Sequence, residues 1–314
     1  MSPYLQELSV YAGHLDVYEK GAEILQKFLR IASHATTVYR ITRELGTAIE
    51  EPLYSGTRQT AVPTQEIVYG MIDGSMIFTD NQWREVKLGR LFAASSIAEA
   101  SRETSQLETS QQSRRGRSIA DSEYAAYLGG HEEFTRRFDL LAHQHKDRGD
   151  DLVFINDGAA WIWAWITQNY PEATQILDFY HAAEYLGSFA RACFDSPEQS
   201  AEWLAQQKAR LLAGGFDRVV SAITQQACNA VPAVAEEATR VLGYFRTHRD
   251  RMRYDEYIKR GLIIGSGAIE SAHRTLVQAR MKLSGQRWTN DGAADMLNLR
   301  VASLSNRWEG VASL

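Results

Sequence analysis

The sequence predicts a mixed α/β protein, and three observations carry that prediction. Two neighbouring stretches, 65–80 and 83–95, are rich in the β-branched and aromatic residues that favour strands. A later block, 151–181, has the pattern of a short apolar strand, an apolar helix and a second short strand, which is typical of a parallel βαβ unit. The residues that follow, 181–260, have helical spacing almost throughout.

Composition sets the class of protein. A chain of 314 residues that is 44% hydrophobic can bury a sizeable core, and its net charge of -5 argues against a uniformly basic nucleic-acid binder while leaving room for local basic clusters. Cys193 and Cys228 have no metal-binding spacing, so we expect reduced, buried thiols in a reducing compartment. No leader pattern or membrane-length apolar run is present in the sequence, so a cytoplasmic protein with no membrane partner is expected.

The N-terminal residues, from about 4 to 50, have helical spacing, and a second helix there is predicted to end at Gly46 as its C-cap. One side of the first helix carries the apolar residues Ile24, Leu25, Phe28, Leu29 and Ile31. Two short helices with a tight turn could form a helix-turn-helix that presents Thr36, Thr37 and Arg40 to DNA. A plain helical hairpin is the alternative.

The middle of the chain is predicted in three pieces. Residues 101–117 are polar and basic at their end, so a surface loop or a widened hairpin is expected. Residues 118–128 suggest a third strand that ends in a turn at Gly129 and Gly130. The helix predicted next has its apolar face at Phe134, Phe138, Leu141 and His145.

Three acids stand out because of the elements that carry them. Asp73 lies within the first predicted strand, Asp157 ends a later strand, and Glu270 lies in the first turn of a late helix. Their spacings, 157 − 73 = 84 and 270 − 157 = 113 residues, mean that only a folded sheet could bring them together. Carboxylates at strand ends suit Mg²⁺, and two such ions can activate a water or a 3′-hydroxyl, which is phosphodiester chemistry.

Each acid also has a structural interpretation. Asp157 could cap the Trp-rich helix that follows it, and Glu270 could gain from the dipole of its own helix without any metal. Asp73 and Gly74 could form a turn. Paired carboxylates also serve glycoside hydrolysis, but nothing else in the sequence indicates a sugar-binding cleft.

The residues around the acids carry a resemblance to a known family. They are "MIDGSMI" at Asp73, "FINDGAAWIW" at Asp157, "LDFYHAAEYL" with Asp178 and His181, and "GSGAIESAHRTLVQARMKLSGQRWT" at Glu270. The chain resembles the DDE transposases of bacterial insertion sequences, in particular the Kra group, with wider similarity to the Mutator-like superfamily. The resemblance extends from about residue 4 to 310, and its last block is long and specific.

The resemblance implies a ribonuclease H-like catalytic domain with an all-helical insertion between the second and third acids. The implied parts are a helical, DNA-binding-like region over 1–60, the first part of the core over 61–180, the insertion over 181–260 and the final core helices over 261–314. Asp73, Asp157 and Glu270 would then hold two Mg²⁺ ions, with Mn²⁺ as a possible substitute.

The resemblance also implies residues that contact DNA. His181 completes a C/D-x-x-H signature that begins at Asp178, and in the family this histidine is thought to contact DNA near the cleavage point. Trp203, in the insertion, could stack on an unpaired or flipped base, as an insertion-domain aromatic does in related transposases. The structural alternatives are a helix cap for Asp178, an ordinary polar role for His181 and core packing for the tryptophans Trp161, Trp163, Trp165 and Trp203.

Basic residues support DNA as a partner. Between Arg240 and Arg260 there are seven Arg or Lys residues against three acids, and cations continue past Glu270. His273 and Arg280 lie seven residues apart (280 − 273), so they share a helix face. The predicted DNA-contacting residues of this region are His273, Arg274, Arg280, Lys282 and Arg287. A solvated helix face is the alternative.

The function expected from the sequence is a DNA transposase that cleaves at insertion-sequence ends and transfers the strand. Its partners would be terminal inverted repeats and target DNA, it would act as a homodimer or higher oligomer, and it would be associated with the nucleoid. The alternatives are a domesticated, transposase-derived DNA-binding or regulatory protein, and a ribonuclease H-like nuclease without strand transfer. Family members often have a longer N-terminal region than the 72 residues that precede Asp73, so a shortened end-recognition module or domestication is also expected.

Overall fold

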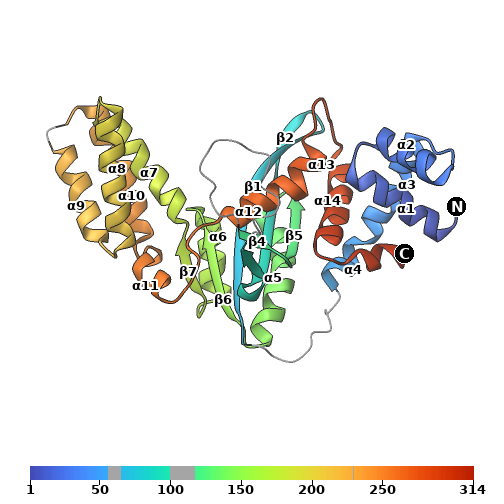
Figure 1. The fold of residues 1–314 in the computed structure, drawn as a ribbon, viewed down its shortest axis with the longest axis horizontal. Helices are drawn as coiled ribbons and strands as arrows, with labels where there is room; N and C mark the ends of the chain where they lie inside the picture. The colour runs from blue at the N-terminus through green and yellow to red at the C-terminus, as the bar shows by residue number, and fades with distance from the viewer. Residues whose placement is uncertain (56–64, 100–116, 229) are drawn as a thin grey trace. The chain divides into compact units, whose positions relative to one another are not determined.

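The computed structural model describes residues 1–55, 65–99, 117–228 and 230–314 (Figure 1). It confirms a mixed α/β architecture with a five-stranded sheet in the order β5-β2-β1-β6-β7. By packing, the described residues divide into two compact units. Unit 1 comprises Met1–Leu152 and Ala268–Leu314, and unit 2 comprises Val153–Gly267. The four-part division expected from the sequence stays a prediction beside this two-part packing.

Four helices open unit 1: α1 (Pro3–Leu15), α2 (Tyr18–Leu29), α3 (Ala35–Ala48) and α4 (Glu50–Ser55). Their small core is built from Ala12, Ala22, Leu25 and Val38. The apolar face predicted for α2 is wrong in part. Leu25 is buried, but Ile24, Phe28 and Leu29 are exposed, because α2 packs through the narrower stripe of Gly21, Ala22 and Leu25.

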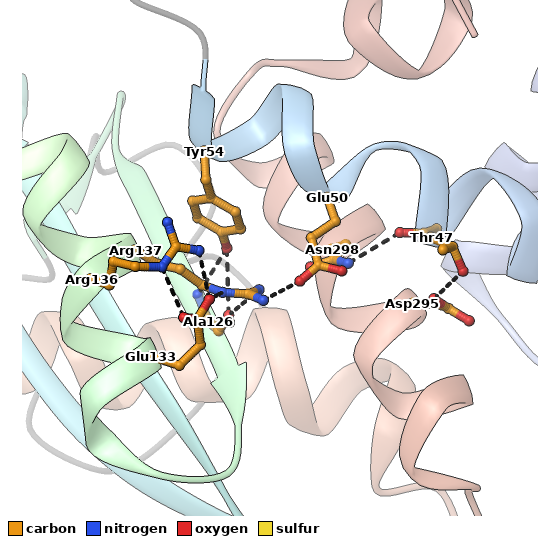
Figure 2. Close-up of polar contacts among 10 residues, drawn as sticks. Thr47, Glu50, Tyr54, Ala126, Glu133, Arg136, Arg137, Asp295 and Asn298 are labelled. Atoms are coloured by element: carbon orange, nitrogen blue, oxygen red, sulfur yellow. Dashed lines mark hydrogen bonds and ion pairs between the residues drawn. The ribbon is translucent and has the colours of Figure 1, made fainter.

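Gly46 does not end its helix, because α3 continues to Ala48. Gly46 instead lets α3 approach α14 (Asn290–Leu304), since a Cβ atom there would lie 2.7 Å from the backbone oxygen of Asp295. Figure 2 shows the polar contacts of this interface: Thr47 donates to Asp295 (2.8 Å) and the Asn298 amide donates to the Gly46 carbonyl (3.1 Å). The N-terminal helices are therefore packed firmly into unit 1.

The same close-up shows a second anchor, at α4. Arg137 forms ion pairs with Glu50 and with Glu133 (3.0 Å), and its guanidinium lies 4.8 Å from the ring centroid of Tyr54 (Figure 2). The Tyr54 hydroxyl bonds the backbone of Ala126 in the sheet. Because Arg137 is itself buried, these partners are what make its charge tolerable inside the unit.

The strands of unit 1 begin with a long hairpin, β1 (Ile67–Thr79) and β2 (Gln82–Ala93), which confirms the two neighbouring strands. Asp80 and Asn81 connect them with positive φ values of 44° and 61°, the conformation of a two-residue hairpin turn that these side chains tolerate. On its other edge β2 pairs with β5 (Glu123–Leu128). Helix α5 (His131–Asp147) follows, with its predicted apolar face buried.

The strand predicted over 118–128 is divided in the structure. β4 (Arg117–Ile119) pairs with β3 (Ile97–Glu99) in a separate two-stranded sheet, and β5 joins the main sheet. The short turn η1 (Ala94–Ser96) precedes β3, and Ser96 accepts a hydrogen bond from Ala120 at the break. The predicted loop lies outside the described residues, apart from Arg117.

The C-terminal part of unit 1 departs from one continuous helix over 267–281. It contains α12 (Gly267–Ala272), a π-helical turn η4 (His273–Gln278) and α13 (Ala279–Met281), followed by α14 and α15 (Trp308–Ala312). A π turn leaves carbonyls off the regular ladder. Here the buried Arg300 guanidinium donates to the carbonyls of Thr275 and Leu276, the latter at 3.2 Å.

The predicted βαβ block lies in unit 2, apart from Asp151 and Leu152 at the start of its first strand. β6 (Asp151–Asn156) pairs in parallel with β7 (Thr174–Leu177), and α6 (Ala160–Asn169) connects them. Trp163 and Trp165 are buried, which confirms their packing role, and Trp161 is half-buried. The helices that follow are α7 (Phe179–Cys193), α8 (Pro197–Leu212), α9 (Phe216–Ala227), α10 (Pro232–Thr247), the short turn η3 (Arg249–Arg251) and α11 (Tyr254–Lys259).

Two further expectations can be compared with the structure. Cys193 and Cys228 are free thiols, but Cys228 is exposed and Cys193 half-buried, so the expected burial of both is wrong. Among the described residues, no helix is long and apolar enough to cross a membrane.

Candidate active site

Asp73 lies in the interior of β1, where the strand is paired on its β2 side along its whole length. Its register partner is Leu88, and that of Gly74 is Lys87, so the alternative of an Asp73-Gly74 turn is wrong. The side chain is 40% exposed, and its Oδ1 accepts a hydrogen bond from the Gly74 amide at 2.7 Å. Because strand side chains alternate, Asp73 and Ser75 share a face of the sheet.

His273 packs against this acid. Its Nε2 lies 3.6 Å from Asp73 Oδ2, and the side chain is 4% exposed. Neither ring nitrogen makes a hydrogen bond within the described part of the chain. Burial lowers the pKa of His273 to about 4; the backbone of Asp73 opposes that shift and Lys282 adds to it. The ring is therefore neutral at pH 7, and its contact with Asp73 is not an ion pair there.

Glu270 lies on the first turn of α12 and its side chain is 61% exposed, with Arg274 Nη2 3.9 Å from Oε2. The helix start is held by a residue that sequence reasoning missed. Arg90 of β2 donates to the Ala268 carbonyl (2.8 Å) and to Ser122 Oγ (3.0 Å). Its signal was a lone arginine in the apolar run "KLGRLFA", since a buried guanidinium needs such partners.

Asp157 comes directly after the last residue of β6, as predicted. Its Oδ1 accepts a hydrogen bond from the Ala159 amide (3.0 Å), and its carbonyl accepts one from Trp163 Nε1 (2.7 Å). A Cβ on Gly158 would lie 2.4 Å from the Tyr244 ring, so glycine is required for that close approach. Asp157 therefore binds the backbone just before α6, but it is not the N-cap of that helix, which is Ala159, so the capping alternative holds only in part.

Two residues of α10 and its end complete the surroundings of Asp157, and neither was found from the sequence. Tyr244 stacks on Tyr185 with ring centroids 3.8 Å apart, and burial, Tyr185 and Asp157 all raise the pKa of its hydroxyl. His248 lies 4.7 Å from Tyr244 by ring centroids, and burial together with Arg251 lowers its pKa to about 4. Tyr244 and His248 lie four residues apart, about one helical turn, and this spacing is the sequence pattern that could have identified them as neighbours.

His181 lies beside this cluster, 6.1 Å from the Tyr244 ring by centroids and with Nδ1 3.7 Å from Glu184. Asp178 is the N-cap of α7, accepting a hydrogen bond from the Tyr180 amide (2.8 Å), which is the structural role considered for it. Its other oxygen accepts a hydrogen bond from Ser266.

The predicted DNA-contacting residues separate by exposure. Arg274, Lys282 and Arg287 are exposed, and Lys282 Nζ donates to Ser75 Oγ at 2.6 Å, two residues from Asp73. Arg280 is completely buried. Its Nε donates to the Gly13 carbonyl (3.1 Å), and its guanidinium lies between the rings of Tyr18 and Trp288.

Burial also limits the contacts that His273 and Trp203 can make with DNA. His273 and Arg280 are both buried, and the helix face that they are predicted to share stays a prediction. Trp203 is 8% exposed and packs against Phe189 and Phe194, with centroids 5.3 and 6.1 Å apart. In this structure Arg280, His273 and Trp203 therefore have no free surface for a phosphate or a base, and core packing is the role observed for Trp203.

The three acids are divided between the two units: Asp73 and Glu270 belong to unit 1, and Asp157 belongs to unit 2. Across the described residues, no group of three or more His, Cys, Asp or Glu side chains is arranged to hold a metal ion. The observation that fits a cation is local to unit 1: a carboxylate with a neutral, buried imidazole beside it whose nitrogens make no hydrogen bond.

Comparison with known proteins gives little. No family model matches the chain, and no curated protein matches it. Among solved structures, the Drosophila P element transposase strand transfer complex is similar at a TM-score of 0.32 and 8% identity, over 98% of this chain and 80% of that one. A likeness at this TM-score supports no conclusion about what this chain does.

Proposed function

We propose that this chain is a metal-dependent DNA transposase, which cleaves a strand at the end of a mobile element and joins the freed 3′-hydroxyl to target DNA. The observation that carries the proposal is the set of elements bearing the acids: Asp73 inside β1, Asp157 directly after β6 and Glu270 on the first turn of α12. The helices α7–α11 lie between the second and third acids, where the resemblance implies an insertion.

In this proposal Asp73, Asp157 and Glu270 hold the metals as carboxylate ligands and do not transfer protons. Two Mg²⁺ ions, when bound, supply the activation of the attacking oxygen and the stabilisation of the leaving one. The chain supplies the rest. Arg90 holds the start of α12 against the sheet, so that Glu270 is presented from a supported turn.

DNA contacts are assigned to exposed cations near the acids. Lys282, fixed at Ser75 two residues from Asp73, and Arg274, one turn after Glu270, are placed to attract the phosphates beside the reacting one. Arg287 extends this set. The N-terminal helices would recognise the element's ends, with Thr36 and Arg40 exposed on α3, and pairing of two ends would require at least a dimer.

The test uses DNA that carries the element's ends, with Mg²⁺ or Mn²⁺. Asp73→Asn, Asp157→Asn and Glu270→Gln should each lower both cleavage and joining by at least about 100-fold, more than loss of an outer partner of a metal ligand costs. The matched control is Asp217→Asn, which removes an exposed acid of α9 paired with Arg249 and should leave both steps unchanged.

The outcomes separate the related functions. Cleavage without joined products would indicate a ribonuclease H-like nuclease, and end binding without cleavage would indicate a domesticated DNA-binding or regulatory protein. Wild-type activity in all three acid variants would contradict the proposed site.

A further inference from the structure

The strongest unexplained feature of unit 1 is the imidazole of His273. It is 4% exposed, and both of its ring nitrogens are buried without a hydrogen bond in the part of the chain that the structure describes. A neutral imidazole has one donor and one acceptor, and a buried donor or acceptor without a partner destabilises the folded protein. Within the described residues the ring has a backbone contact with Asp73 but no well-formed hydrogen bond, so a bound ligand could still complete its polar contacts.

The position of the ring indicates what that partner is. His273 Nε2 faces Asp73 Oδ2 at 3.6 Å. Two ligands that each lie about 2.1 Å from one cation can be at most about 4.2 Å apart, and the observed separation lies inside that limit. Glu270 precedes His273 by three residues, the Glu-x-x-His spacing with which helices present a carboxylate and an imidazole to one metal.

The fold holds this imidazole in place from both sides of the sequence. Arg90 fixes the start of α12 at the Ala268 carbonyl, and Arg300 binds the carbonyls of Thr275 and Leu276 in the π turn that begins at His273. Because both arginines are buried and bind the backbone on either side of His273, they fix the position of its ring beside Asp73. Preorganised ligands of this kind are what a metal site requires.

We propose that His273 is a metal ligand beside Asp73, with Glu270 on the same helical segment, and that unit 1 therefore binds a divalent transition metal such as Mn²⁺ or Co²⁺ more tightly than Mg²⁺. This inference rests on the proposed function, because it takes Asp73 as a ligand. Mg²⁺ prefers oxygen ligands, whereas a nitrogen ligand strengthens binding of transition metals along the Irving–Williams order.

The experiment measures metal binding to the full chain without DNA. Calorimetric titration with MnCl₂ and with MgCl₂ is done on wild type, on His273→Asn and on His14→Asn, a second buried histidine of unit 1 with no acid beside it. We expect His273→Asn to lose at least about tenfold in Mn²⁺ affinity with little change for Mg²⁺, and His14→Asn to keep the wild-type preference.

A second readout begins with the wild-type protein, so its first result does not depend on a variant folding. Pulsed electron paramagnetic resonance of Mn²⁺ bound to wild type should show coupling to an imidazole nitrogen, and that coupling should disappear in His273→Asn. Absence of the nitrogen coupling in wild type, or equal affinities for Mn²⁺ and Mg²⁺, would overturn the inference.

The two proposals fail in different ways. If DNA cleavage requires Asp73 but bound Mn²⁺ shows no nitrogen ligand, the inference about His273 is wrong and the function stands. If the nitrogen coupling is present but no DNA cleavage or joining occurs, the metal site stands and the transposase proposal is wrong.

Discussion

Asp73 in unit 1 and Asp157 in unit 2 each have a buried histidine nearby, but the two histidines make different contacts. Each acid is carried by a strand or its end, and each has a buried histidine nearby, His273 or His248, whose pKa is lowered to about 4 mainly by burial. His248 packs against the rings of Tyr244 and Trp163, whereas His273 faces a carboxylate.

The difference lies in what each acid and histidine already bind. Asp157 accepts a hydrogen bond from the Ala159 amide, and Trp163 and Tyr244 close around its backbone, so the position of this carboxylate is set by the protein. Within the described residues, neither ring nitrogen of His273 makes a hydrogen bond. Unit 2 also has buried polar atoms without a hydrogen bond within the described residues, His248 Nδ1 and the Tyr244 hydroxyl, but the His248 ring packs against aromatic rings, whereas the His273 ring faces a carboxylate.

The largest expected effect concerns the framework of unit 2. Trp203→Ala should lower the free energy of unfolding by about 3–5 kcal/mol, because it removes a ring packed between Phe189 and Phe194. Thermal or urea unfolding measures it, with Trp83→Ala as the control, since Trp83 is 65% exposed. Unchanged stability together with weaker DNA binding would instead support base stacking by Trp203.

The next prediction compares how the stability of the two units depends on pH. Burial, reinforced by a nearby arginine in each case, lowers the pKa of His14 in unit 1 and of His248 in unit 2 to about 4. The unfolded chain then binds more protons between pH 6.5 and 4, so the stabilisation is complete above pH 6.5 and is lost as pH falls toward 4. Each histidine should lower the free energy of unfolding by about 2 kcal/mol when the pH falls from 7 to 5.

Urea unfolding at pH 7, 6 and 5 checks this, and His14→Gln and His248→Gln should each flatten the pH dependence. If one variant flattens it and the other does not, the two units differ in how they bury histidine. Equal slopes in wild type and both variants would contradict the prediction.

A smaller effect separates buried from exposed cations in unit 1. Arg287→Ala should weaken DNA binding and reduce the slope of log affinity against log salt by about 0.9, the value for one lost phosphate contact. Arg280→Met should change stability and leave that slope unchanged, because Arg280 binds Gly13 and two aromatic rings. Binding titrations at several salt concentrations measure both, and an altered slope for Arg280→Met would show that its region opens on DNA.

The smallest effect is expected where the two units meet along the sequence, at Gly265 and Gly267. A Cβ on Gly265 would lie 2.6 Å from the Tyr180 ring, whereas one on Gly267 has no atom within 4 Å. Gly265→Ala should destabilise by about 1 kcal/mol, since Tyr180 is exposed and can move aside. Gly267→Ala should be neutral or stabilise by up to about 1 kcal/mol, measured by the same unfolding experiment.

Most of the framework could be predicted because it depends on local pattern. The βαβ block was found from short apolar strands around an apolar helix, and the hairpin strands from their β-branched residues. Expectations failed where tertiary contacts decide burial. Phe28 has the spacing of a core residue and is 76% exposed, because the surface available on α1 matches only the small residues beside Leu25.

The candidate site could be predicted only in its acids. The sequence predicts Asp73 inside a strand, Asp157 at a strand end and Glu270 in the first turn of a helix, and the structure has them on these elements. The π turn has no distinct sequence period, so the inward direction of His273 and Arg280 could not be derived from their spacing alone. Arg90 acts on Ala268, 178 residues later in the chain, and such a distant partner leaves no local signal.

The junction at Ser266 has a consequence for engineering. The Phe179 amide donates to the Ile264 carbonyl (2.9 Å), and Asp178 binds Ser266, so the chain enters and leaves the α7–α11 segment at one point. The segment is not held at this point alone, because the Tyr254 hydroxyl donates to the Leu177 carbonyl (3.0 Å) and Tyr244 packs against Gly158. A replacement segment could be joined here through two or three residues, at about 3.8 Å each, provided that it supplies those contacts again.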